Sequence, residues 1–168
     1  MKTVKEYFFC SPKLLRNINE INEIDQCLDK VKWRPDFSLE IDGKKYDYRS
    51  GYNKALEVEF SKLGWELKPK VYSEPRLIGD FYKNDVFVEV QFGNSSTLYR
   101  DYYKFHYGLT NNLLALAVLI TSTRPIEFFP NRNPDSVSNM AEFKLAEKYF
   151  RLLLIPVPIL LIGLLPEN

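Results

Sequence analysis

Two acidic residues and an amide lie close together in the segment GDFYKNDVFVEVQFGN, residues 79–94. Eight residues separate Asp80 from Glu89, and one residue separates Glu89 from Gln91. Their neighbours are mostly valines and aromatic residues, which are typical of a buried strand. Charged and amide side chains are locally inconsistent with such a strand, and inconsistencies of this kind concentrate at functional sites. We therefore treat these three side chains as candidates for chemistry.

A tight turn between the two acids would bring them together. Asn84 and Asp85 tolerate the left-handed backbone of a two-residue hairpin turn, which would place Asp80 opposite Glu89. Their Cβ atoms would then lie about 4.5 to 5.5 Å apart, where like charges destabilise a sheet. A divalent cation would compensate, because Mg²⁺ is usually held by one or two carboxylates together with waters and phosphate oxygens. The alternative is an exposed pair at a strand end. This turn pairs Lys83 with Val86, Tyr82 with Phe87, and Phe81 with Val88.

A third acid, Glu59, belongs to the predicted helix SGYNKALEVEFSKLGW. At helical spacing Glu59 shares the apolar face with Tyr52 and Leu56, whereas Glu57 turns toward solvent. Unpaired buried charge is expensive, so an acid on this face needs a reason. We expect Glu59 to reach the same metal through water. A frayed or shifted helix would instead expose it.

The composition indicates one ordinary globular domain. The chain has 168 residues, of which 45% are hydrophobic and 27% charged, and we expect a single domain over residues 1–168. The net charge of +1 gives no global sign of a nucleic acid or membrane partner. Cys10 and Cys27 are too few for a disulfide framework. With no pattern of a secretory signal at the start, we expect a cytoplasmic protein with reduced thiols.

Hydrophobic periodicity and turn residues predict an α/β (α+β) fold, in which a mixed central β-sheet is flanked by helices. The apolar run 152–165 is broken by prolines and falls short of the roughly 20 residues of a spanning helix, so we expect a buried strand. The predicted helices are 11 to about 32, 50–64, 97–109 and 136–153. The predicted strands are a hairpin within 37–49, three short strands at 65–72, 76–82 and 86–92, a central strand at 112–122, and the final apolar run.

The spacing of Asp80, Glu89 and Gln91 resembles the core of PD-(D/E)XK nucleases. The segment VFVEVQFGN is similar to the variant found in BglII-type restriction endonucleases, where glutamine replaces the usual lysine. The resemblance covers most of the second half, including YYKFHYGLTNNLLALAVLI and PVPILLIGL, and is weakest before about Gly51. It departs from the general motif because Gly79 stands where a proline would precede the aspartate.

The resemblance implies a restriction-endonuclease-like fold and a type II restriction endonuclease. Such an enzyme hydrolyses double-stranded DNA with Mg²⁺ at a short palindromic site, leaves 5′-phosphate ends, acts as a homodimer and accompanies a DNA methyltransferase. Asp80, Glu89 and the Val90 carbonyl would be metal ligands, and Gln91 would orient water or a phosphate. Because a metal can lower the pKa of bound water, no histidine base is needed, which suits a chain whose single histidine is His106.

Two polar segments are candidates for contacting DNA. The first is the strand-to-helix junction after Gly93, where small side chains and free backbone amides suit phosphates or base edges. The second is the segment STRPIEFFPNRNPDSVSN, in which arginine and asparagine could read bases, although it could also be a plain connection. Lys104 is a further candidate for phosphate contact. The candidates in the two segments are Asn94, Ser95 and Ser96, then Asn131, Arg132, Asn133, Asp135 and Ser136.

Two other functions remain open. One is a nuclease that selects branched or damaged DNA during repair or junction resolution. The other is a catalytically inactive DNA-binding module. The residue pattern gives neither the recognition sequence nor the cut position, because base contacts depend on loop geometry and bound water.

Overall fold

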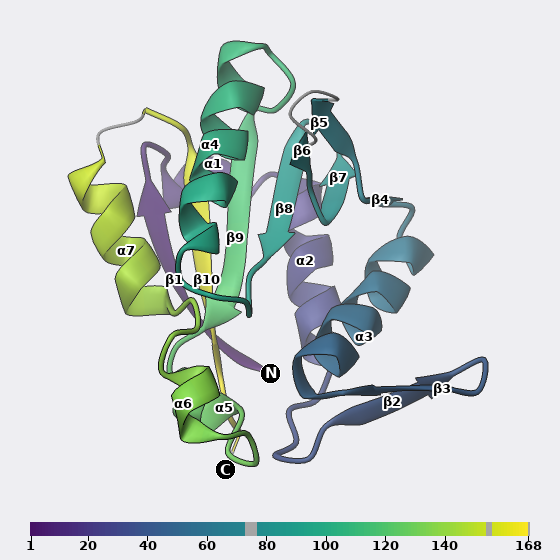
Figure 1. Ribbon diagram of the computed structural model, residues 1–168. Coiled ribbons are helices and arrows are strands. Elements are labelled where there is room, and N and C mark those ends of the chain that lie inside the picture. Colours follow the sequence, from purple (N-terminus) through teal and green to yellow (C-terminus); the bar gives the residue numbers. More distant parts are fainter. Residues whose placement is uncertain (73–76, 154–155, 168) are drawn as a thin grey trace.

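The computed structural model describes residues 1–72, 77–153 and 156–167. Its centre is a six-stranded mixed sheet with helices on both faces (Figure 1). This arrangement confirms the predicted fold class. In spatial order the strands are β1 (Lys2–Phe8), β10 (Ile159–Leu165), β9 (Leu116–Ser122), β8 (Val86–Val90), β7 (Phe81–Lys83) and β4 (Glu66–Leu67).

The three middle strands β8, β9 and β10 run parallel, and the outer strands are antiparallel to their neighbours. Parallel strands need crossover connections. Helix α4 (Thr97–Thr110) joins β8 to β9, and α5 (Pro125–Phe128), α6 (Pro134–Val137) and α7 (Phe143–Leu152) join β9 to β10. Every residue of β9 is buried, as its continuous apolar run predicted for a strand covered on both faces.

The hairpin between β7 and β8 confirms the predicted turn and register. Asn84 and Asp85 have φ values of 46° and 63°, the left-handed backbone of a two-residue turn. The register then follows from the turn, because the pairing of each residue is set by its distance from the loop. The observed pairs are Phe81 with Val88, Tyr82 with Phe87, and Lys83 with Val86.

Two hydrophobic clusters cover the two faces of the sheet. Helices α2 (Asn19–Lys30) and α3 (Tyr48–Lys62) pack on one face, where Val86, Val88 and Val90 point. Helices α4 and α7 pack on the other face, where Phe87 points. Since side chains alternate along a strand, Glu89 projects toward α4 with Phe87. The predicted inward direction of the three valines is confirmed.

Two small hairpins extend the fold. Strands β2 (Ser38–Ile41) and β3 (Lys44–Asp47) form the predicted hairpin, in which Asp42 and Gly43 have φ values of 51° and 72°. Strands β5 (Lys70–Tyr72) and β6 (Leu77–Ile78) form the second. The predicted strand 76–82 is therefore divided between β6 and β7, and its first residue lies outside the described residues.

The prediction of one helix from residue 11 to about 32 is wrong. Ser11 caps the short helix α1 (Pro12–Leu15), but Ile18 is extended, with φ −89° and ψ 114°, and α2 begins after it. Both helices keep the apolar period, so periodicity could not reveal the break. The helix predicted at 136–153 begins at Phe143 instead. The edge strand β1 was not predicted. It is held by pairing with β10, a contact distant in sequence.

The final apolar run forms β10, as predicted, although residues 154–155 of that run lie outside the described residues. Within the described chain, we find no helix with the length and apolarity required to span a membrane. Cys10 and Cys27 are both free thiols.

Replacing Gly79 by alanine should destabilise the protein. A Cβ atom at this position would lie 2.2 Å from Cζ of Phe87, whose ring is only 2% exposed in the core under α4. The ring cannot move aside without repacking, so we expect a loss of about 1 to 3 kcal/mol in the free energy of unfolding. Denaturant unfolding measures it, and Ser61→Ala, an exposed change on α3, should stay within about 0.5 kcal/mol of wild type. A Gly79→Ala protein as stable as wild type would contradict the described packing.

Candidate functional site

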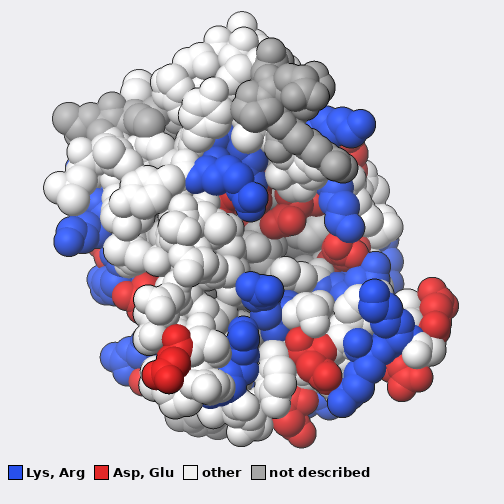
Figure 2. Space-filling model, viewed as in Figure 1, with Lys and Arg blue, Asp and Glu red and all other residues white. Residues whose placement is uncertain are grey.

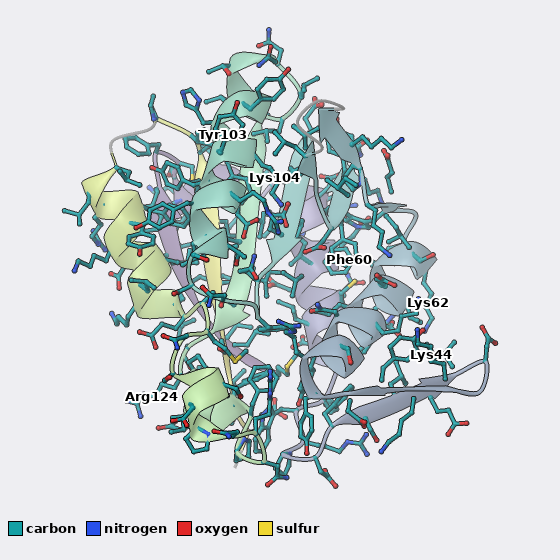
Figure 3. All side chains as sticks on the ribbon, in the orientation of Figure 1. Lys44, Phe60, Lys62, Tyr103, Lys104 and Arg124 are labelled. Atoms are coloured by element: carbon teal, nitrogen blue, oxygen red, sulfur yellow. The ribbon has the colours of Figure 1, made fainter. Side chains whose placement is uncertain are left out.

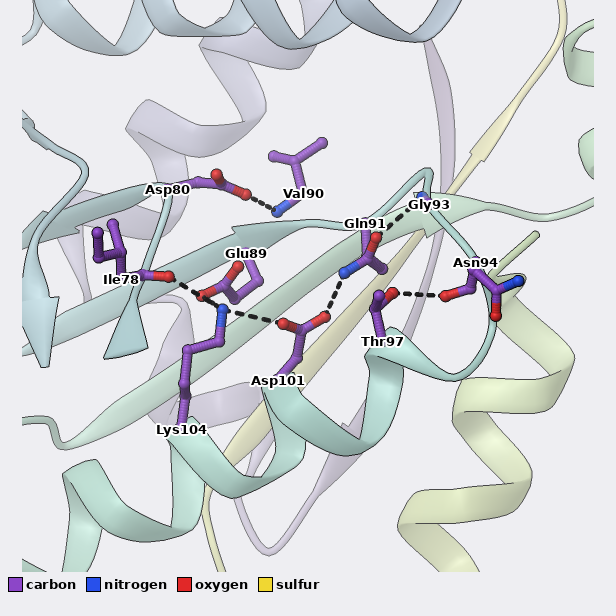
Figure 4. A network of polar contacts seen from close by, with 10 residues as sticks. All are labelled: Ile78, Asp80, Glu89, Val90, Gln91, Gly93, Asn94, Thr97, Asp101 and Lys104. Carbon is purple, nitrogen blue, oxygen red and sulfur yellow. Dashed lines mark hydrogen bonds and ion pairs between the residues drawn. The ribbon is translucent and has the colours of Figure 1, made fainter. Parts of the chain in front are cut away.

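Asp80 directly precedes β7 and extends the pairing of β7 with β8 by one residue. Its backbone N–H donates to the Val88 carbonyl at 3.3 Å, and its Oδ2 accepts from the Val90 N–H at 2.7 Å (Figure 4). The next N–H, from Gln91, donates to Ile120 on β9 at 2.8 Å. Since successive residues of a strand point their backbone groups to opposite sides, the Val90 carbonyl also leaves the strand on the Asp80 side. Asp80 and the Val90 carbonyl therefore share one edge of β8.

Glu89 is buried in the sheet, with 4% of the residue exposed. One carboxylate oxygen, Oε1, accepts from the Lys104 ammonium group. Burial raises the pKa of Glu89 well above its ordinary value, Lys104 opposes that rise, and the charges of Asp80 and Asp101 add to it. Burial also raises the pKa of Asp80, against the lowering effects of the Val90 N–H and of Lys104. Both carboxylates therefore lack sufficient compensating positive charge.

Lys104, which we expected to contact a DNA phosphate from the surface, lies buried inside this site. The residue is 1% exposed, and it points from α4 toward β8 (Figure 3). Besides Glu89, its Nζ lies 2.9 Å from Oδ1 of Asp101 and donates to the Ile78 carbonyl at 3.1 Å. A lysine is almost never fully buried unless it is paired, and here the pairing partners are acids of the candidate site.

Asp101 connects Lys104 to Gln91. Its side chain is fully buried, and its Oδ2 accepts from Nε2 of Gln91 at 2.6 Å. The other end of the Gln91 carboxamide, Oε1, accepts from the Gly93 N–H at 2.8 Å. Sequence reasoning missed Asp101. The available signal was an acid and a lysine at i, i+3 on the same helical face as the buried Phe105.

The prediction that Glu59 reaches this acidic cluster is wrong. Glu59 pairs with Lys62 at 2.6 Å and Lys30 at 3.6 Å, and it borders a surface groove of about 540 Å³ between α2, α3 and β2. Its neighbour Glu57 lies on the other flank of the α3 apolar stripe, and the charge of Glu57 raises the pKa of Asp80. Glu57 itself forms ion pairs with Lys54 at 2.8 Å and with Lys68 at 3.4 Å.

The donor set suits a hard divalent cation. In the described cluster three carboxylates, those of Asp80, Glu89 and Asp101, share the single ammonium group of Lys104. Across residues 1–72, 77–153 and 156–167, no group of three or more His, Cys, Asp or Glu side chains is arranged to hold a metal ion. Mg²⁺ does not require one, because two carboxylates, a carbonyl oxygen and waters complete its shell. Figure 2 shows acidic side chains in a hollow of this face, with Lys and Arg side chains around it.

The two predicted DNA-contact segments lie side by side. Ser95 donates its N–H to the Asn139 carbonyl at 2.8 Å, and Asn94 forms a β-bridge with Met140. These contacts join the β8–α4 junction to the segment that precedes α7. Most of the predicted side chains are accessible. Asn94, Ser96, Asn131, Asn133, Asp135 and Ser136 are exposed, and Ser95 and Arg132 are half-buried.

The segment predicted as a long polar loop contains the short helices α5 and α6. Asn133 caps α6 by accepting from the Asp135 N–H at 2.8 Å, and Ser136 Oγ donates to the Asn133 carbonyl at 2.7 Å. Asn131 donates to the Pro35 carbonyl at 3.1 Å. These local bonds give the segment a defined shape close to the β8–α4 junction.

Comparisons with known proteins agree with this arrangement. The family model described as restriction endonuclease BglII/BglIII matches residues 4–164. The crystal structure of restriction endonuclease BglII complexed with a DNA 16-mer is similar at 22% identity and a TM-score of 0.78, over 100% of this chain and 78% of that one. Free BglII is similar at 22% identity and a TM-score of 0.67, over 99% of this chain and 81% of that one. No curated protein matches the chain.

Replacing Glu89 by glutamine should change how stability depends on pH. The pKa of Glu89 is raised above 4.5 by burial, so the folded chain binds this proton more tightly than the unfolded chain. Stability therefore falls as the pH rises above the unfolded pKa of a glutamate, about 4.3, toward the raised folded pKa, and Glu89→Gln removes that contribution. In metal-free buffer, the free energy of unfolding of the variant should increase relative to that of wild type as the pH increases. Glu40→Gln, an exposed change on β2, is the control and should follow wild type. Parallel curves for wild type and Glu89→Gln would contradict the burial of a titrating Glu89.

Proposed function

Because this chain belongs to the restriction endonuclease BglII/BglIII family, we propose that it cuts double-stranded DNA at a short palindromic site with Mg²⁺, leaving 5′-phosphate ends. The family consists of type II site-specific deoxyribonucleases, so the chain is a phosphodiester hydrolase that cleaves DNA sequence-specifically. The observation that carries the finer proposal is a buried glutamate, Glu89, beside Asp80 at the edge of β8. We propose that residues 1–168 form one nuclease domain of the PD-(D/E)XK superfamily, in its E-x-Q subgroup.

Asp80, Glu89 and the Val90 carbonyl would hold the metal. When bound, Mg²⁺ polarises the phosphoryl oxygen and lowers the pKa of its water. The protein contributes a dry and rigid setting, because Glu89 is buried and Asp80 is bonded to the Val90 N–H. A rigid ligand set reduces the reorganisation required when the reaction begins.

Gln91 would orient the attacking water or a phosphate oxygen. A carboxamide has two N–H donors and a carbonyl oxygen with two lone pairs. Among the contacts of the described residues, Asp101 takes one donor and the Gly93 N–H takes one lone pair. One donor and one lone pair are left for water and phosphate. Since a glutamine does not titrate, this role would not depend on pH.

The joined segments around Asn94 and α6 would read the DNA sequence. Their exposed amide and hydroxyl groups, together with Arg132, suit base edges and phosphates. Lys104 is excluded from this surface by its burial. The segment around Asn94 follows directly after β8, and the segment that contains α6 is joined to it by the bridge between Asn94 and Met140.

We further propose that the enzyme acts as a homodimer in the cytoplasm, beside a DNA methyltransferase that protects the host site. Two-fold protein symmetry matches a palindromic DNA site, which places one catalytic site on each strand. Sedimentation of the protein on its cognate duplex should therefore give two chains per duplex. One chain per duplex would contradict the dimer and leave the cleavage proposal standing.

Digestion of a large sequenced DNA with Mg²⁺ tests the function. Wild type should give discrete ends that share a short palindrome, read by sequencing the fragments. Glu89→Ala and Asp80→Asn should each lower the cleavage rate at least about a hundredfold, because even outer contacts to metal ligands are worth 10 to 100-fold. Glu59→Gln is the control, a partly buried acid that pairs with Lys62 and Lys30 outside the acidic cluster, and it should cut like wild type.

The same digestion separates the alternatives. Preferred cleavage of branched or damaged DNA over every linear duplex would favour the structure-selective nuclease. DNA binding without hydrolysis at any metal concentration would favour the inactive binding module, and either result would overturn the restriction proposal.

A further inference from the structure

The ammonium group of Lys104 has three polar partners inside the candidate site. It donates to Glu89 Oε1 and to the Ile78 carbonyl at 3.1 Å, and it forms an ion pair with Asp101 Oδ1 at 2.9 Å (Figure 4). The residue is 1% exposed, so water does not compete for these contacts. The structure thus places the ammonium group of Lys104 directly against the carboxylate of Glu89.

Glu89 is also a metal ligand under the proposed function, on which this inference rests. Two cations that share one buried carboxylate repel each other strongly, because the low dielectric of the interior weakens charge screening. Either the metal binds less tightly than it would without Lys104, or the Lys104–Glu89 pair loosens as the metal enters. In both cases Lys104 lowers the affinity for the metal.

We propose that Lys104 is a built-in cation that competes with the divalent metal for Glu89 and sets the metal concentration at which the site becomes loaded. Lys104 is in this sense a positioning residue, since it acts through Glu89. It also holds the buried carboxylates in place before metal arrives, by supplying the positive charge that they otherwise lack. Burial of Glu89 without metal would be far less favourable in its absence.

Asp101 has the opposite electrostatic effect. Its buried negative charge attracts any cation in the site, and its Oδ1 gives Lys104 a second partner when Glu89 is engaged by metal. Removing the charge of Asp101 should therefore weaken metal binding, whereas removing the charge of Lys104 should strengthen it. If this ion pair had only a structural role, the metal affinity of both variants would change in the same direction.

The test is binding of Mn²⁺ alone to the DNA-free protein, followed by the loss of the free Mn²⁺ signal in electron paramagnetic resonance. Lys104→Met should bind Mn²⁺ at least about tenfold more tightly than wild type, and Asp101→Asn should bind it several-fold more weakly. Lys104→Arg keeps the positive charge and is the matched control, so its binding should not tighten. Equal or weaker binding by Lys104→Met, with cooperative unfolding retained, would overturn the proposal.

A second measurement uses wild type only and does not depend on any variant folding. In ¹⁵N-lysine-labelled protein, the Nζ resonance of the buried Lys104 should shift as Mg²⁺ is added, with the same midpoint as metal binding. A resonance that stays unchanged while metal binds would overturn the competition. Wild type that cleaves DNA and binds Mn²⁺, without tighter binding by Lys104→Met and without a shift of the Lys104 resonance, would contradict only this inference. If wild type neither binds Mn²⁺ nor cleaves DNA, the proposed function fails as well.

Discussion

Much of this structure depends on the burial of a charged residue, Glu89, in a strand that is covered on both faces. A carboxylate in such a place is stable only with compensating positive charge or hydrogen bonds. Helix α4 supplies positive charge from one side, through Lys104, whereas the charge of Asp101 on the same helix acts against Glu89. The arrangement nevertheless leaves excess negative charge around Asp80 and Glu89, and this deficit is the physical basis of a cation site.

The path of the chain around β8 connects the candidate metal ligands to the candidate DNA-contact segments. The strand ends beside the acidic pair, Gln91 turns its carboxamide back to α4, and the next residues pair with the segment before α7. The candidate metal ligands, the amide proposed to orient water and the first candidate DNA-contact segment therefore follow one another within residues 80–96. The end of a strand inside a rigid sheet holds candidate catalytic groups more accurately than a loop would.

Local chemistry explains which parts of the site could be predicted. The turn residues Asn84 and Asp85 and the two-residue period of the strands set the hairpin register, and with it the position of Asp80 relative to Glu89. Turn type and alternation act over a few residues, so sequence is sufficient for them. The same reasoning failed for Lys104, because its burial depends on an acid, Glu89, that another element supplies.

By itself the sequence determined the hairpin, the covered central strands and the apolar stripe of α3. Only the tertiary structure decided that Glu59, on one flank of that stripe, pairs with Lys30 and Lys62 and does not join the acidic cluster. It also decided that α4 contributes Lys104 to the acidic cluster. The reason is that periodicity orients a side chain relative to its own helix or strand, whereas its neighbours depend on how distant elements pack together.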